Sequence, residues 1–164
     1  VKEINIDGKT ADITNWQEII DSKDISIKFE LETLSLSYFG SRAKTYLRLL
    51  TGDRVKVQNI NLKNIGVNTH VFSQLLNAPE LNIYSVDILD RPEYTLMNYI
   101  YGVRVLHFWK TNISFEWLKL VISGTAVELV IFTDLALTGI APDFILPTSV
   151  KEIKLTNVKI SFKN

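Results

Sequence analysis

The segments 1–6, with the sequence VKEINI, and 150–155, with the sequence VKEIKL, are nearly the same six residues. Between them one apolar pattern returns: an anchor residue, followed three and five positions later by two more apolar residues. The seven anchors are Val1, Leu31, Val57, Leu81, Val103, Val127 and Val150. From Leu31 onward the anchors lie 22 to 26 residues apart. Repetition at this period indicates a solenoid.

Each unit predicts a short strand followed by a short helix. Apolar residues at the anchor, at plus three and at plus five fit a strand that buries one face. In five units apolar residues return at plus fifteen, plus eighteen and plus nineteen, a spacing that places them on one face of a helix. We therefore expect helices at residues 15–21, 44–51, 70–77, 94–101 and 115–123.

The alternation of strand and helix predicts an α/β solenoid: a parallel sheet of about seven short strands, with the helices on its convex side. We expect one domain over residues 1–164, and we expect it to belong to a longer chain because the sequence opens and closes inside recognisable units. A doubly wound α/β domain is the alternative. Its βαβ units usually need about 30 residues or more, and its buried strands are continuous apolar runs. Both features favour the solenoid.

Nearly the whole chain resembles a leucine-rich repeat. Units of that family have apolar residues at the anchor, plus three and plus five, then Asn or Cys at plus eight. Here plus eight holds Phe39, Ile65, Leu89, Leu135 and Val158, with Thr111 as the exception. The units are irregular, and their long helical half is most similar to the cysteine-containing repeats of F-box substrate receptors. The resemblance implies a protein-binding solenoid with no cofactor.

Composition narrows the class of partner. The 18 basic and 18 acidic residues cancel, whereas nucleic-acid binding needs a concentrated positive face, so we expect no nucleic acid. No apolar run is long enough to span a bilayer, so we expect no membrane partner. The absence of cysteine and of a signal peptide favours a cytoplasmic or nuclear protein.

Catalytic and metal-binding patterns are weak. His70 and His107 are the only histidines, and they fall in different halves of the repeat, so they should not meet around a metal. A serine triad would need a histidine, an acid and a serine to converge, and the spacing brings no such set together. We expect no enzyme activity, no metal and no cofactor.

Alternation also predicts which strand residues face outward. The plus-five residues Leu62, Val86, Phe108 and Phe132 should form one buried ladder, while plus two, plus four and plus six should form the concave surface. The rows of this surface are polar at their ends and apolar or aromatic in the middle. The predicted partner-binding residues are Ile83, Val105, His107, Trp109 and Ile131, fringed by Lys63, Asp87, Lys110 and Asp134.

An apolar centre with a tryptophan and a charged rim is typical of a protein-binding surface. We therefore expect a non-catalytic module that binds a protein or peptide, in substrate recognition or scaffolding. Two other interpretations of the patch stay open: an insertion or a neighbouring chain covers it, or the register is off by one residue. The alternative function is structural, a segment that stacks on flanking repeats or self-associates end to end, because its terminal strands lack polar caps.

Overall fold

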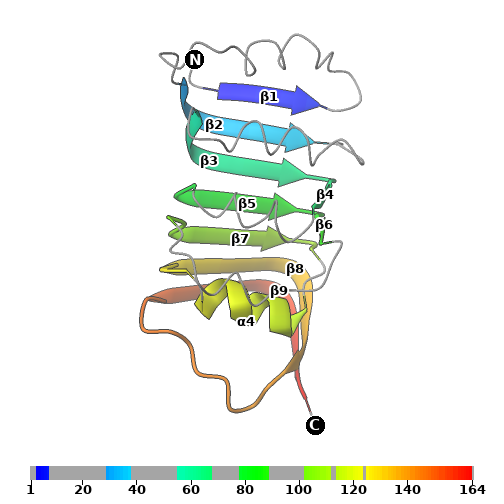
Figure 1. Cartoon of the computed structure of the whole chain (residues 1–164). Coiled ribbons are helices and arrows are strands. Elements are labelled where there is room, and N and C mark those ends of the chain that lie inside the picture. The colour runs from blue at the N-terminus through cyan, green and yellow to red at the C-terminus, as the bar shows by residue number, and fades with distance from the viewer. Residues whose placement is uncertain are drawn as a thin grey trace.

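The computed structural model describes residues 3–7, 29–37, 55–67, 78–88, 102–111, 114–123 and 125–163. Its main sheet is parallel throughout, and its strands follow the order β1-β2-β3-β5-β7-β8-β9 (Figure 1). The bounds of these strands are β1 Glu3–Asp7, β2 Phe29–Ser37, β3 Val55–Lys63, β5 Glu80–Tyr84, β7 Val105–Trp109, β8 Leu129–Ile140 and β9 Glu152–Phe162. Two short strands, β4 (Gly66–Val67) and β6 (Asp87–Ile88), pair in a second sheet.

The prediction of a parallel, solenoid-like stack is confirmed. Spatial order follows sequence order, and each strand of the main sheet begins within two residues of its predicted anchor. A doubly wound sheet would place strands out of sequence order. Side chains are described in full on β5, β7, β8 and β9 and from Val57 onward on β3.

The chain turns sharply seven residues after the anchors Val57, Val103, Val127 and Val150, and again at Ser85 in the fourth unit. The residues at this corner have positive φ angles between 43° and 54°, a conformation that non-glycine residues adopt mainly in tight turns. Backbone hydrogen bonds join neighbouring corners, among them Asn64 N–H to the Tyr84 carbonyl at 3.0 Å. The corner residues are Asn64, Ser85, Lys110, Asp134 and Asn157.

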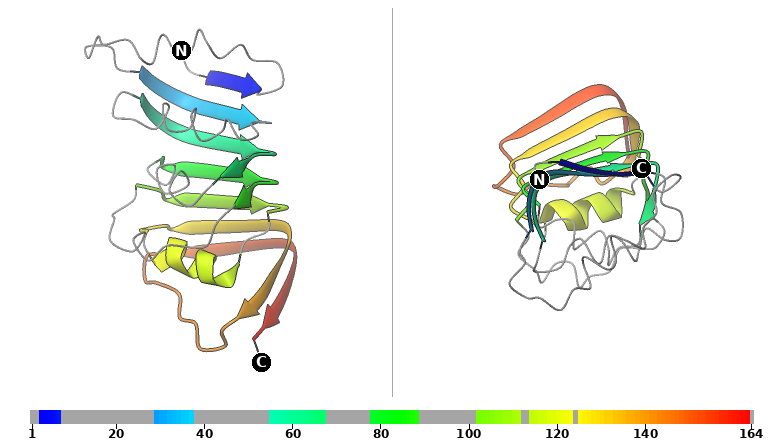
Figure 2. Two further views of the ribbon diagram at one scale, coloured as in Figure 1. Left: turned by 45° about the vertical axis from the view of Figure 1, so that its right-hand side comes forward. Right: turned by 90° about the horizontal axis from the view of Figure 1, so that it is seen from above.

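The core lies behind the main sheet, on the side that α4 (Phe115–Ser123) covers (Figure 2). Two rows of inward side chains cross the strands, and Phe108 stacks on Phe132 with ring centroids 5.6 Å apart. On α4, Leu118, Val121 and Ile122 are buried, which is the expected apolar face of the helix. The two sheet rows are Ile60, Leu81, Leu106 and Val130, and Leu62, Ile83, Phe108 and Phe132.

The helix predicted at residues 115–123 is confirmed as α4. The helices predicted at 15–21, 44–51, 70–77 and 94–101 lie outside the described residues. Within the described part of the chain, no helix is long and apolar enough to cross a membrane.

The predicted register of the fourth unit is wrong by three residues. Leu62 pairs with Ile83, and Ile83 pairs with Phe108, so this unit begins at Ala78 rather than at Leu81. Val86 is buried, as expected, but it lies beyond the corner and Ile83 takes its place in the ladder. Ser85 at the corner, with φ of 50°, marks the same register.

Candidate functional site

The sheet face turned away from α4, here called the open face, consists of the residues that alternate with the core rows. On β7 this alternation makes Val105, His107 and Trp109 half-buried while Leu106 and Phe108 are fully buried. On β8 the corresponding open-face residues are Leu129, Ile131 and Thr133. Over β7 and β8 the open face therefore combines the apolar or aromatic Val105, Trp109, Leu129 and Ile131 with the polar His107 and Thr133.

The corrected register changes what β5 contributes to this face. Ile83 was predicted on the surface, but it is 0% exposed and packs in the core. Asp87 was predicted at the rim, but it belongs to β6, beyond the corner. Tyr84 takes the position opposite Trp109, and Asn82 takes the position opposite His107. Neither residue is evident from the repeat pattern, because alanine at the true anchor, Ala78, is a weak apolar signal.

Three ring side chains form one cluster at the carboxyl end of the open face. The rings of His107 and Trp109 lie 3.3 Å apart between centroids, at 30° to each other. The Tyr84 and Trp109 rings lie 6.4 Å apart at 57°, within the range of favourable aromatic contacts. We call Tyr84, His107 and Trp109 the aromatic cluster.

Two predicted rim lysines meet at this cluster. The Lys63 Nζ lies 5.3 Å from the centroid of the Tyr84 ring, and the Lys110 Nζ lies 5.8 Å from it. Both are cation–π distances. Both lysines are exposed, and neither forms an ion pair with another described residue. The cluster therefore has a cationic edge.

A polar ladder borders the cluster on its N-terminal side. The Asn82 amide donates to Asn61 Oδ1 at 3.0 Å, and the Asn61 amide donates to Ser35 Oγ at 3.2 Å. His107 Nε2 continues the polar contacts toward β8, 3.1 Å from Thr133 Oγ1. Partial burial lowers the pKa of His107 below its ordinary value of 6.5, so burial favours the neutral form of its ring.

The remaining predicted residues lie at the margin. Ile131 is half-buried beside His107, its partner across the β7–β8 register. Asp134 is an exposed corner residue that accepts a hydrogen bond from the Asn157 amide at 2.9 Å. Asp134 and Lys110 are corner residues of neighbouring units. Of the two, Lys110 is the one that lies over the Tyr84 ring.

The described residues hold no group of three or more metal-ligating side chains. Comparison of the chain with family models, with curated proteins and with solved structures finds no match. The function is therefore inferred from the geometry of the open face.

Proposed function

We propose that the open face is a non-catalytic binding surface for a protein or peptide. The observation that carries this proposal is the aromatic cluster, in which a half-buried Trp109 contacts both Tyr84 and His107. Neighbouring Val105 and Ile131 extend it as an apolar surface. Aromatic side chains at the centre of an apolar patch contribute most of the energy of many protein interfaces.

The charged rim complements this centre. Lys63, at the end of β3, and the corner residue Lys110, after β7, flank the Tyr84 ring from the two sides of β5. Exposed rim charges steer association and set its salt dependence more than they set affinity. The positive charge of the two lysines favours a partner whose contacting segment is acidic, because neither lysine forms an ion pair with a described carboxylate.

We infer further that the chain is an irregular leucine-rich repeat that works in the cytoplasm or nucleus, in substrate recognition or scaffolding. The described units combine a strand, a corner and a residue at plus eight that is buried in three of them, as Ile65, Val86 and Thr111. In the unit that departs from an apolar plus eight, the Thr111 hydroxyl donates to the Trp109 carbonyl at 2.8 Å and is 2% exposed. That polar residue satisfies the backbone behind the corner, at the position where the family has Asn or Cys.

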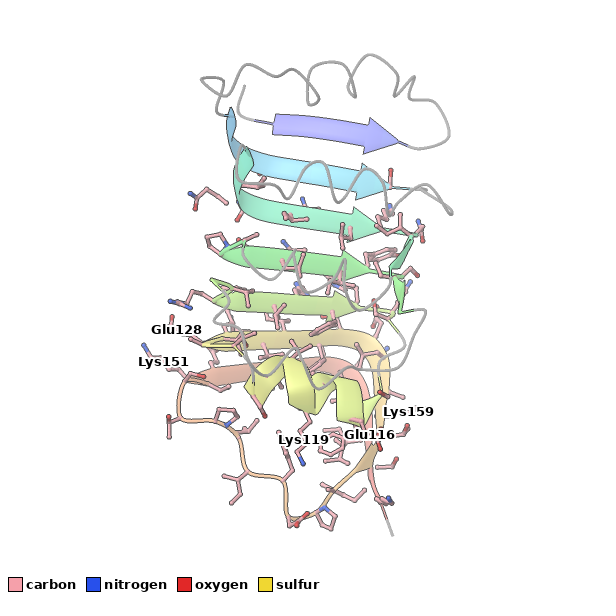
Figure 3. The ribbon with its side chains drawn as sticks, in the orientation of Figure 1. Glu116, Lys119, Glu128, Lys151 and Lys159 are labelled. Carbon is pink, nitrogen blue, oxygen red and sulfur yellow. The ribbon has the colours of Figure 1, made fainter. Side chains whose placement is uncertain are left out.

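The test is capture of partners from a lysate of the source cells, with quantification for wild type, Trp109→Ala and Lys119→Ala. Lys119 is an exposed residue of α4, on the opposite side of the sheet, and it serves as the control (Figure 3). A partner of the open face should be retained by Lys119→Ala and depleted by Trp109→Ala. Its dissociation constant should rise about thirtyfold, which corresponds to about 2 kcal/mol.

Equal capture by all three proteins would remove the open face as the binding site. Unfolding curves of the purified proteins must accompany the experiment. Trp109 is only half-buried, so its truncation should leave the fold intact. Loss of binding without loss of stability is the outcome that supports the proposal.

The second candidate function is structural, stacking on flanking repeats or self-association. The observation that favours it is the exposed apolar edge of β9, where Phe162 is 62% exposed. This edge is a different surface from the open face. Trp109→Ala should therefore leave any stacking or self-association unchanged.

A further inference from the structure

Positive charge gathers at one end of the open face. The ammonium nitrogens of Lys63 and Lys110 lie 5.3 Å and 5.8 Å from the centroid of the Tyr84 ring. The acidic residue of β5, Glu80, stands at the opposite end of that strand, about 13 Å from Tyr84 along the chain. The carboxyl end of the face is therefore cationic, and the carboxylate on β5 is too far away to neutralise it.

The two lysines reach the same ring from opposite sides. Lys63 ends β3, Lys110 is the corner residue after β7, and β5 lies between these two strands (Figure 1). Both nitrogen-to-ring distances are shorter than the Debye length, which is about 8 Å at physiological ionic strength. An anionic group placed over the Tyr84 ring is therefore attracted by both ammonium groups.

These lysines differ from the two that have a carboxylate within reach. Lys151 and Lys154, in the last unit, form ion pairs with N–O distances of 3.4 Å and 3.8 Å. Lys63 and Lys110 form no ion pair with a described carboxylate. The cations at the aromatic cluster can therefore bind an anionic group of a partner without first breaking such a pair.

Apolar surface adjoins the cationic site at a spacing that suits an extended peptide. Tyr84 lies opposite Trp109 on β7, and Ile131 lies one strand farther, on β8. Neighbouring strands are about 4.8 Å apart, and alternate side chains of an extended chain are about 6.8 Å apart. A peptide that crosses the strands with one side chain over Tyr84 therefore places another, two residues away, over Trp109 and Ile131.

The kind of cation favours a carboxylate over a phosphate ester. Both residues are lysines, whose ammonium groups act as point charges, whereas phosphorylated peptides are usually bound by clusters of arginine. Among the described residues the one arginine is Arg104, which precedes β7 at the opposite end of the face. Its guanidinium donates to the Val103 carbonyl at 3.4 Å.

We propose that the open face recognises a partner segment in which an aspartate or glutamate lies two residues from an aliphatic side chain. The carboxylate sits over Tyr84, between Lys63 and Lys110, and the aliphatic side chain packs on Trp109 and Ile131. This chemistry of the partner rests on the peptide-binding function proposed for the open face.

The test is selection of a phage-displayed library of random dodecapeptides on immobilised protein. Wild type should enrich sequences with an acidic residue two positions from an aliphatic residue. The double variant Lys63→Gln, Lys110→Gln should lose the acidic preference and keep the aliphatic one, whereas Trp109→Ala should lose the aliphatic one. The double variant Lys151→Gln, Lys154→Gln removes the same charge from the last unit, and as the matched control it should select as wild type does.

Fluorescence anisotropy then compares three forms of the selected peptide, with glutamate, glutamine or phosphoserine at the acidic position. Wild type should bind the glutamate form about tenfold more tightly than the glutamine form, because two exposed ion pairs are lost together. The variant Lys63→Gln, Lys110→Gln should bind these two forms equally.

Equal binding of the glutamate and glutamine forms by wild type overturns the proposal, and so does a library without enriched acidic sequences. If Trp109→Ala still weakens both forms, the open face remains the binding surface and only its preference for an acidic partner is wrong. Equal binding by wild type and Trp109→Ala removes the open face itself. Tighter binding of the phosphoserine form than of the glutamate form overturns the choice of a carboxylate.

Discussion

Strands β7 and β9 occupy the same positions of the repeat, yet their side chains have opposite environments. Leu106 and Phe108 on β7 are 0% exposed, while their equivalents on β9, Ile153 and Leu155, are more than a third exposed. Both strands alternate apolar and polar residues. The difference arises from the neighbours: β7 lies between β5 and β8, whereas among the described strands only β8 lies beside β9. In a solenoid, the burial of a side chain therefore depends on the strands on either side of it as well as on the pattern of its own strand.

The largest expected effect compares truncations in one row. Phe108→Ala should reduce the free energy of unfolding by about 3–5 kcal/mol, because it removes a fully buried ring that stacks on Phe132. Leu155→Ala, in the same row, should cost about 1 kcal/mol, since half of that side chain already contacts water. Denaturant titration of both variants measures the difference. Equal losses would mean that β9 is covered in solution.

The sequence predicted the period, the parallel order and α4 because these depend on patterns within each unit. It misplaced the fourth unit because residues 81–86 are compatible with two registers: Leu81 with Ile83, or Tyr84 with Val86. Tyrosine suits a core or a surface, so composition does not separate them. The slip exchanged Ile83 for Tyr84 in the binding patch. The packing of neighbouring strands selects the first register, because Ile83 pairs with Leu62 on one side and with Phe108 on the other.

The exposure of β9 could not be derived from its own residues. Ile153 and Leu155 have the pattern of core positions, and only the strand order reveals that nothing described covers them. The contacts within the aromatic cluster were also beyond sequence analysis. The cation–π contacts of Lys63 and Lys110 depend on Tyr84, which the predicted register placed in the core row.

A second, smaller effect compares the plus-eight positions of the two strands. Val86 N–H lies 3.4 Å from the buried Thr111 hydroxyl, which itself donates to the Trp109 carbonyl. Thr111→Val should lower the free energy of unfolding by about 1–2 kcal/mol because it removes the acceptor of the buried Val86 N–H. The equivalent residue in β9 is Val158, which is half-buried, and Val158→Thr should change stability by less than about 0.5 kcal/mol.

Thermal and denaturant unfolding at pH 7 would measure both variants, with Thr111→Ser as the control that keeps the hydroxyl. A Thr111→Val protein as stable as wild type would show that the hydrogen bonds at this corner contribute nothing net. A large loss of unfolding free energy from Val158→Thr would mean that Val158 is more deeply buried in solution than its exposure in the structure indicates.

The smallest effect concerns His107, whose plus-four counterpart on β9 is the exposed Lys154. Neighbours on both sides of β7 partly bury the imidazole, and this lowers the pKa of His107 from 6.5. The folded protein then binds fewer protons than the unfolded chain between the two pKa values. This contribution to stability is fully present above pH 6.5 and is lost as pH falls through the lower pKa of the folded state. Wild type should lose more stability than His107→Gln between pH 7.5 and pH 5.5, by less than the effect of Thr111→Val. Denaturant titration of both proteins at both pH values measures these losses. Equal losses would mean that the imidazole of His107 is as well hydrated in the folded protein as in the unfolded chain.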